Sequence, residues 1–147
     1  MLKLRDIMTT DVVTASPELS LREAMDLLSS RHITGAPVVA GGKVVGVFSA
    51  SDLLAFLSDF DGSESSLEFR RKRHDPLEEV AVAEVMTRYV QSLPPDCPVD
   101  KAAAFMHEAN IHRVLVMEDD VLMGIVSTTD VAIAVADHRL GRAGAAK

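Results

Sequence analysis

The sequence repeats itself at a constant offset of 78 residues, and this feature constrains its fold more than any other. Met8-Thr9 recurs as Met86-Thr87 (86 − 8 = 78). Gly46-Val47-Phe48-Ser49-Ala50-Ser51-Asp52 recurs as Gly124-Ile125-Val126-Ser127-Thr128-Thr129-Asp130. A repeat that keeps its register over about fifty residues predicts two copies of one fold unit.

Each copy has the order strand, helix, strand, strand, helix. In the first half, the pattern predicts strands at residues 12–14, 37–39 and 44–48, a helix after Ser20 that Gly35 ends, and a second helix from Asp52. In the second half, it predicts strands at 90–93, 114–117 and 121–126, and helices at 99–109 and 131–136. Each half is too short to bury a sufficient core alone, so we expect an α+β fold of two βαββα units packed into one compact module.

The domain boundaries follow from changes in composition. We predict a first domain at residues 2–57 and a second at 81–137. Residues 58–80 are polar and rich in turn formers, which indicates a partly mobile linker with some helix near 67–73. Residues 138–147 are expected to form a flexible tail.

Charge and composition exclude several classes of protein. The net charge of −7 disfavours binding to nucleic acid or to an anionic membrane surface. The basic run Arg70-Arg71-Lys72-Arg73-His74 is better interpreted as a solvated segment than as a nucleic-acid patch. No apolar run is long enough to span a membrane, and the single cysteine forms no internal disulfide. These features predict a cytoplasmic protein.

The last strand of each half leads into the pattern Gly-x-x-Ser-x-x-Asp. The simplest interpretation is a helix cap, because Ser-x-x-Asp before an apolar helix satisfies the first backbone N–H groups. The pattern is also duplicated, follows an apolar strand directly, and places a hydroxyl and N–H groups at a helix N-terminus, which suits a ribose or a phosphate. The aspartate can accept hydrogen bonds from two sugar hydroxyls. Capping and binding do not exclude each other.

Two further pairs of segments match at the same offset. They are Asp6-Ile7-Met8-Thr9 with Glu84-Val85-Met86-Thr87, and His32-Ile33-Thr34-Gly35-Ala36-Pro37-Val38-Val39 with Asn110-Ile111-His112-Arg113-Val114-Leu115-Val116-Met117. Together with the two Gly-x-x-Ser-x-x-Asp patterns, they make the chain resemble a tandem pair of CBS (cystathionine β-synthase) domains, called a Bateman module. The resemblance covers residues 2–137, nearly the whole chain.

The resemblance implies two units related by pseudo-twofold symmetry, with clefts between them that bind adenosine-containing ligands. AMP, ADP and ATP are the first candidates, with S-adenosylmethionine and NAD-type ligands as alternatives, and no cofactor is required. It also implies a homodimer formed through the helices that follow the Ser-x-x-Asp patterns. In the family, each cleft combines the aspartate of one unit with strand residues of the other. The first cleft would use Ser49, Asp52, Ser92, Leu93, His112, Arg113 and Val114, and the second Thr14, Ala15, Thr34, Ala36, Pro37, Ser127 and Asp130.

The two clefts are expected to differ in charge. The guanidinium of Arg113 is a strong hydrogen-bond donor to phosphate. The equivalent position in the first half is Gly35, which has no charged side chain. We therefore expect the Asp52 cleft to prefer a phosphorylated nucleotide, and the Asp130 cleft to be weaker or to favour a less anionic ligand. Two alternatives stay open. Arg113 can instead pair with Glu118, Asp119 or Asp120, and His112 can be a half-buried strand residue.

Other chemistry has little support in the sequence. The five histidines show no metal-ligand spacing, no pattern of catalytic residues is present, and Cys97 is better interpreted as a plain cysteine than as a reactive thiol. We therefore predict a regulatory, ligand-sensing protein that is not an enzyme, and that acts on an unidentified partner or on its own assembly. The alternative is a structural adaptor with vestigial clefts, whose interface would be the helix faces Leu53/Leu54/Leu57 and Val131/Ile133/Val135.

Overall fold

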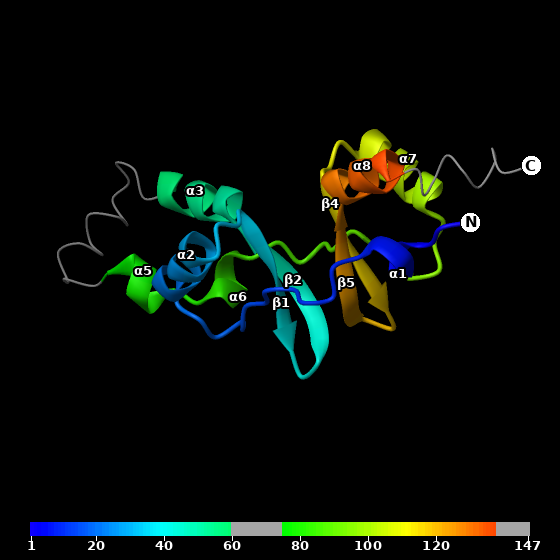
Figure 1. Cartoon of the computed structure of the whole chain (residues 1–147). Coiled ribbons are helices and arrows are strands. Elements are labelled where there is room, and N and C mark those ends of the chain that lie inside the picture. Colours follow the sequence, from blue (N-terminus) through cyan, green and yellow to red (C-terminus); the bar gives the residue numbers. More distant parts are fainter. Residues whose placement is uncertain (60–74, 138–147) are drawn as a thin grey trace, which may run out of the picture. The chain divides into compact units, whose positions relative to one another are not determined.

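The computed structural model describes residues 1–59 and 75–137, and these form two compact units (Figure 1). The N-repeat unit is Val13–Val90, and the C-repeat unit combines Met1–Val12 with the chain from Gln91 onward. The helix expected near 67–73, the basic run Arg70 to His74 and the tail at 138–147 lie outside the described residues. The predicted α+β class with two tandem units is confirmed.

Each unit contains a helix, two strands and a second helix in that order, together with additional short elements. The N-repeat unit contains α2 (Leu21–Ser30), β1 (Gly35–Ala40), β2 (Lys43–Ser49), α3 (Ala50–Ser58), α5 (Pro76–Glu79) and α6 (Val82–Val85). The C-repeat unit contains α1 (Leu4–Ile7), β3 (Ser92–Leu93), α7 (Val99–Ala109), β4 (Arg113–Glu118), β5 (Val121–Ser127) and α8 (Thr128–Ala136). In each unit two antiparallel strands form a hairpin, with an irregularity in register after Val38 and after the equivalent Val116.

Local sequence accounts for most of these boundaries. Ser20 caps α2, with its hydroxyl oxygen 3.1 Å from the backbone nitrogen of Glu23, as the capping-box pattern predicts. The hairpin turns use left-handed backbone at Gly41-Gly42 (φ 58° and 80°) and again at Asp119-Asp120 (φ 51° and 66°). Glycine and aspartate are among the residues that tolerate this conformation. The same turn is therefore built from two different residue pairs.

Two expectations about the first half are wrong. The strand expected at 12–14 is absent, and only Ala15 pairs, as an isolated parallel bridge to Val38. In the second half the strand expected at 90–93 is reduced to the two residues of β3. Gly35 does not end the first helix region: the chain turns at His32 (φ 55°), and Gly35 begins β1.

The segment that precedes each repeat packs on the other repeat. In the C-repeat unit, Leu4 N donates to Cys97 O at 2.9 Å, and Thr9 exchanges two hydrogen bonds with Ile125, each 2.9 Å. The equivalent bonds in the N-repeat unit run from Val82 N to Leu19 O (2.8 Å) and between Thr87 and Val47 (2.9 and 2.8 Å). We call this arrangement the segment exchange. It was not predicted, because four-residue helices such as α1 and α6 show no hydrophobic periodicity.

A glycine in the middle of each hairpin makes the segment exchange sterically feasible. A Cβ atom on Gly46 would lie 2.8 Å from both Met86 Sδ and Thr87 O. A Cβ atom on Gly124 would meet Met8 Sδ and Thr9 O at the same distance of 2.8 Å. Contacts this short are repulsive, and here one of them is to backbone, which cannot turn aside. The repeated glycine and the repeated Met-Thr therefore form one structural device.

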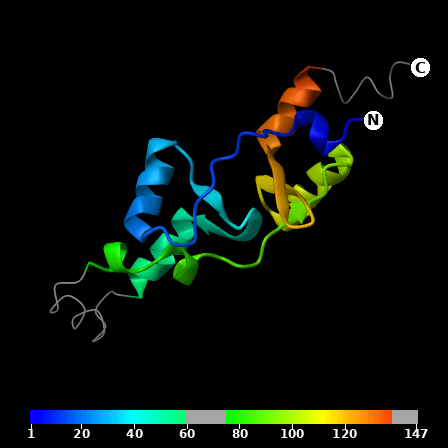
Figure 2. The ribbon, with the colours of Figure 1, turned by 90° about the horizontal axis from the view of Figure 1, so that it is seen from below.

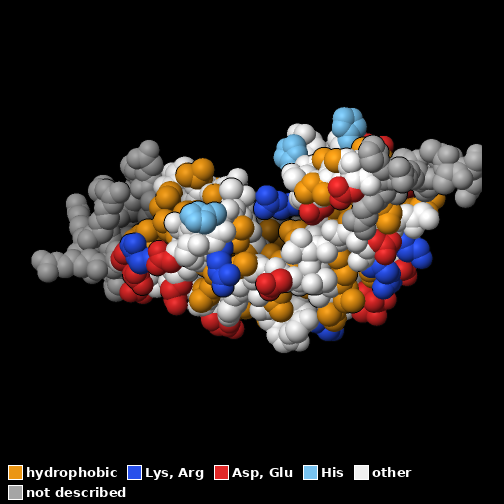
Figure 3. Space-filling view, in the orientation of Figure 1, with side chains coloured by type: hydrophobic (Ala, Val, Ile, Leu, Met, Phe, Trp, Pro, Cys, Tyr) orange, Lys and Arg blue, Asp and Glu red, His pale blue; other side chains and the backbone are white. Residues whose placement is uncertain are grey.

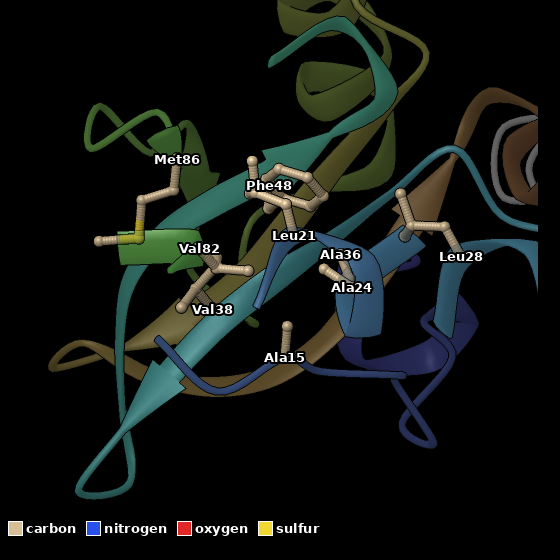
Figure 4. Close-up of a cluster of buried hydrophobic side chains, with 9 residues drawn as sticks. All are labelled: Ala15, Leu21, Ala24, Leu28, Ala36, Val38, Phe48, Val82 and Met86. Carbon is tan, nitrogen blue, oxygen red and sulfur yellow. The ribbon is translucent and has the colours of Figure 1, made fainter. Parts of the chain in front are cut away.

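Each unit has its own hydrophobic core, and the exchanged segments contribute to both. In the N-repeat unit, Val82 of α6 and Met86 lie against side chains of α2 and the β1–β2 hairpin (Figure 4). In the C-repeat unit, Leu4 of α1 is fully buried with Val99, Ala102 and Met106 of α7. The exchanged segments are therefore integral to the cores and are not surface extensions.

Part of the predicted linker is ordered and docks on α2. Arg22, in the first turn of α2, donates to Asp75 Oδ2 and Glu78 Oε1, both at 2.7 Å. The hydrogen bond from Arg22 holds the pKa of Asp75 below its ordinary value. Helix α5 consequently lies beside α2 in both ribbon views (Figures 1 and 2).

Replacing Leu4 should test whether α1 belongs to the core of the C-repeat unit. Leu4 is 0% exposed, so we expect Leu4→Ala to lower the unfolding free energy, and large-to-small changes of this type cost about 2–5 kcal/mol. The measurement is urea unfolding. Val121→Ala is the control, because Val121 is 42% exposed, and surface changes stay within about 0.5 kcal/mol. Equal, small effects of both variants would contradict the described packing of α1.

Candidate functional site

The two Ser-x-x-Asp patterns occupy the same place in the two units, at the junction of the last strand and the last helix. Ser49 ends β2 and is the N-cap of α3, and Ser127 ends β5 and is the N-cap of α8. Each aspartate is the third residue of a nine-residue helix. Both aspartates are half-buried, so their carboxylates are partly open to solvent.

Both patterns form the capping box that the sequence predicts. Asp52 N donates to Ser49 Oγ at 3.4 Å, and Ser49 N donates to Asp52 Oδ2 at 2.8 Å. The equivalent distances at Ser127 and Asp130 are 3.1 and 2.8 Å. In both copies the cap engages Oδ2 of the aspartate, which leaves Oδ1 for other partners.

The second carboxylate oxygen distinguishes the two copies. Thr87 Oγ1 donates to Asp52 Oδ1 at 2.7 Å, and Ser49 Oγ lies 3.1 Å from Asp52 Oδ2. Among the described residues, no side chain donates to Oδ1 of Asp130, although Thr9 is the equivalent of Thr87. Sequence reasoning missed Thr87 as a partner of Asp52. The available signal was the Met-Thr pair, which recurs with the same offset as the aspartate.

Five further predicted site residues belong to the N-repeat unit, which also contains Ser49 and Asp52. Thr34 O accepts a 2.9 Å hydrogen bond from Ala50 N, so Thr34 adjoins the cap, and its side chain is exposed. Ala15 and Pro37, two further predicted site residues, are joined by a hydrogen bond from Ala15 N to Pro37 O at 2.9 Å. Ala15 and Ala36 belong to the buried cluster, Pro37 is also buried, and Thr14 is exposed.

The C-repeat unit brings the other five together with Ser127 and Asp130. His112 O accepts from Thr128 N at 2.8 Å, and Arg113 is paired in register with Ser127. Ser92 and Leu93 form β3, which pairs with β4, and Val114 is buried in the core at 2% exposure. Each predicted cleft takes residues from both units, so the two cleft assignments stay predictions.

The structure decides the two alternatives left open for Arg113 and His112. Both side chains are exposed, so His112 is not a half-buried strand residue. Within residues 1–59 and 75–137, the Arg113 guanidinium forms no ion pair, neither with Glu118 nor with Asp119 or Asp120. An exposed arginine without an acidic partner retains its full capacity to bind a phosphate.

The arrangement is suited to binding. A carboxylate beside the first N–H groups of a helix can accept hydrogen bonds from sugar hydroxyls, while the helix terminus and a nearby guanidinium attract an anion. Burial raises the pKa of the Cys97 thiol, which disfavours the reactive thiolate. In the described part of the chain, no group of three or more His, Cys, Asp or Glu side chains could hold a metal ion.

None of the described helices has the length and apolar character needed to cross a membrane.

Comparison with known proteins gives two matches to one family model. The model of the CBS domain matches residues 4–59 and 82–137. A curated relative, the uncharacterized protein MJ1232 of Methanocaldococcus jannaschii, is 29% identical over 131 residues. Those residues are 88% of this chain but only 38% of MJ1232, so the chain spans well under half of that relative.

Two solved structures are similar over almost their entire length. A putative acetoin utilization protein (AcuB) from Vibrio cholerae is 30% identical with a TM-score of 0.76, and the match covers 97% of this chain and 96% of AcuB. The CBS domain pair of protein MJ0100 was solved in complex with 5′-methylthioadenosine and S-adenosyl-L-methionine. It is 27% identical with a TM-score of 0.70, covering 93% of this chain and 98% of the pair.

Proposed function

This chain belongs to the CBS-domain family and carries two copies of the domain, and from that premise we propose that it is a regulatory module that senses adenosine-containing ligands. The observation that carries the proposal is the duplicated capping box, which presents a partly open carboxylate, Asp52 or Asp130, at a helix N-terminus. The complex of the MJ0100 pair with two adenosyl compounds supports this ligand class.

We assign the ligand contacts as the sequence predicts. Asp52 or Asp130 would hold the ribose hydroxyls, and Ser49 or Ser127 would reach ribose or phosphate. Arg113, exposed and without an acidic partner in the described residues, would bind the phosphate of a ligand held by Asp52. AMP, ADP and ATP are therefore the preferred ligands there. In the Asp130 cleft, the position equivalent to Arg113 is Gly35, which supplies no positive charge. This cleft would therefore favour a less anionic ligand such as S-adenosylmethionine.

The proposed mechanism is regulatory and involves no chemical step. A ligand can change the arrangement of the two units, or of two subunits, only if it binds the two arrangements with unequal affinity. The change would reach a partner protein in the cytoplasm or alter self-assembly.

A thermal melt against AMP, ADP, ATP, S-adenosylmethionine and NADH tests this function. Ligand at about 100 times its dissociation constant adds about 2.7 kcal/mol, so we expect one ligand to raise the Tm by several degrees. Asp52→Ala should reduce the rise for a phosphorylated ligand. Asp26→Ala is the charge-matched control, since Asp26 is exposed on α2 outside the assigned contacts. No rise with any ligand at millimolar concentration would reject the sensor.

Replacing Arg113 tests the phosphate assignment separately. We expect Arg113→Ala to weaken binding of AMP by about tenfold while adenosine binds unchanged, because only AMP carries the charge that the guanidinium recognises. Isothermal titration calorimetry measures both. Arg31→Ala is the control, because Arg31 is exposed at the end of α2 and outside the assigned contacts. Equal affinity of wild type and Arg113→Ala for AMP would contradict the assignment.

Exposed apolar side chains favour a second candidate function, that of an adaptor that dimerises through α3 and α8. Leu54 of α3 is 66% exposed, and Ile133 and Val135 of α8 are 52% and 53% exposed. Figure 3 shows hydrophobic side chains at the surface over α3. Leu53 and Val131, expected in the same interface, instead pack partly on the two cores.

Sedimentation of charge variants tests the homodimer. We expect Leu54→Asp and Ile133→Asp to shift a dimer toward monomer, because each places a charge in an apolar contact. Val121→Asp is the control, because Val121 is exposed at the β4–β5 turn and belongs to neither helix. A dimer that forms in wild type and is unaffected by AMP, together with a melt that no ligand shifts, would favour the adaptor. An unchanged dimer in both helix variants would exclude this interface.

A further inference from the structure

The two aspartates present unequal numbers of open acceptor positions. Asp52 accepts hydrogen bonds on both oxygens: from Thr87 Oγ1 on Oδ1 at 2.7 Å, and from Ser49 N and Ser49 Oγ on Oδ2 at 2.8 and 3.1 Å. Asp130 accepts one, from Ser127 N on Oδ2 at 2.8 Å. Within the described residues, Oδ1 of Asp130 is therefore open to an external donor.

Thr87 is held where it is by the segment exchange. Its backbone makes two hydrogen bonds with Val47 of β2, 2.9 and 2.8 Å long, so its hydroxyl is fixed close to the start of α3. Thr9 makes the same backbone bonds to Ile125 but does not reach Asp130. The two copies share these backbone bonds, and the contact of the Thr87 hydroxyl with Asp52 has no counterpart at Thr9 among the described residues, so the two threonines can be compared directly.

A ribose with two adjacent hydroxyls can donate to both oxygens of one carboxylate. At Asp130 the second hydroxyl finds an acceptor that no described protein group occupies. At Asp52 the same hydroxyl must displace the Thr87 hydroxyl or share Oδ1 with it. Displacement exchanges one hydrogen bond for another and yields little net free energy. Because a carboxylate oxygen can accept two bonds, Thr87 weakens binding without abolishing it.

We infer that Thr87 is a specificity-determining residue that makes the Asp52 copy stringent and leaves the Asp130 copy permissive toward ribose-bearing ligands. This inference rests on the proposed function and deepens it. A nucleoside with no phosphate binds at Asp130, where the hydroxyl pair meets an open carboxylate. At Asp52, a ligand must make a further contact to compensate for the competition with Thr87. An ion pair between its phosphate and a cationic side chain is one such contact. The two copies then respond to different ligands.

The experiment uses adenosine, which reports the ribose contact without a phosphate. Asp130→Asn leaves only the Asp52 copy intact, and Asp52→Asn leaves only the Asp130 copy. We expect Thr87→Val in the Asp130→Asn chain to tighten adenosine binding about fivefold in calorimetry, as the loss of one competing hydrogen bond predicts. Valine keeps the branched shape at residue 87 and replaces the hydroxyl with a methyl group, which cannot donate a hydrogen bond. Thr87→Ser, which restores a hydroxyl, should return the affinity to its original value.

Thr9→Val in the Asp52→Asn chain is the matched control and should leave adenosine affinity unchanged, because Thr9 makes no bond to Asp130. An equal gain in this control, or no gain with Thr87→Val while adenosine still binds through Asp130, overturns the inference and leaves the sensor function standing. Failure of adenosine and AMP to bind wild type and every variant rejects the sensor function, and the inference with it. A thermal melt of each variant confirms that it is folded.

Discussion

The pairing of each Met-Thr segment with the central glycine of a hairpin is the contact on which the rest of the structure depends. Gly46 and Gly124 let the backbone of Thr87 and Thr9 approach to distances that any Cβ atom would prevent. The pairing brings α6 and α1 into the cores, where Val82 and Leu4 are fully buried. Each unit is therefore completed by a segment that precedes the other repeat in the sequence.

The same contact reaches the candidate site. Because Thr87 is fixed on β2, its hydroxyl is within hydrogen-bond distance of the aspartate that begins α3. The capping box then has two roles at once: it satisfies the free N–H groups of the helix, and it holds a carboxylate partly open to solvent. A core contact and a candidate binding residue are thus connected by a single hydrogen bond. Among the described residues, the equivalent hydrogen bond is absent at Asp130.

Sequence reasoning was most successful where the signal was local. The serines that precede the helices, Ser20, Ser49 and Ser127, cap them, and the hairpin turn at Gly41-Gly42 has the left-handed backbone that glycine tolerates. It failed where a contact joins distant residues. The strand predicted at 12–14 is absent. Apolar β-branched residues favour a strand, but a strand also needs a partner, and backbone pairing in this segment is limited to Ala15. Helices α1 and α6 were missed because four residues are fewer than two helical turns.

The sequence by itself determined the duplication, the family and the two capping aspartates, because each is written in residue types at short or constant spacing. Only the tertiary structure decided that residues 1–12 complete the unit of the second repeat, and that Asp52 accepts a bond from Thr87 while no side chain in the described part of the chain donates to the equivalent oxygen of Asp130. The physical reason is that a side-chain hydrogen bond depends on positions to within a few tenths of an ångström. Two repeats with the same motif can satisfy the same backbone bonds and still differ in that distance.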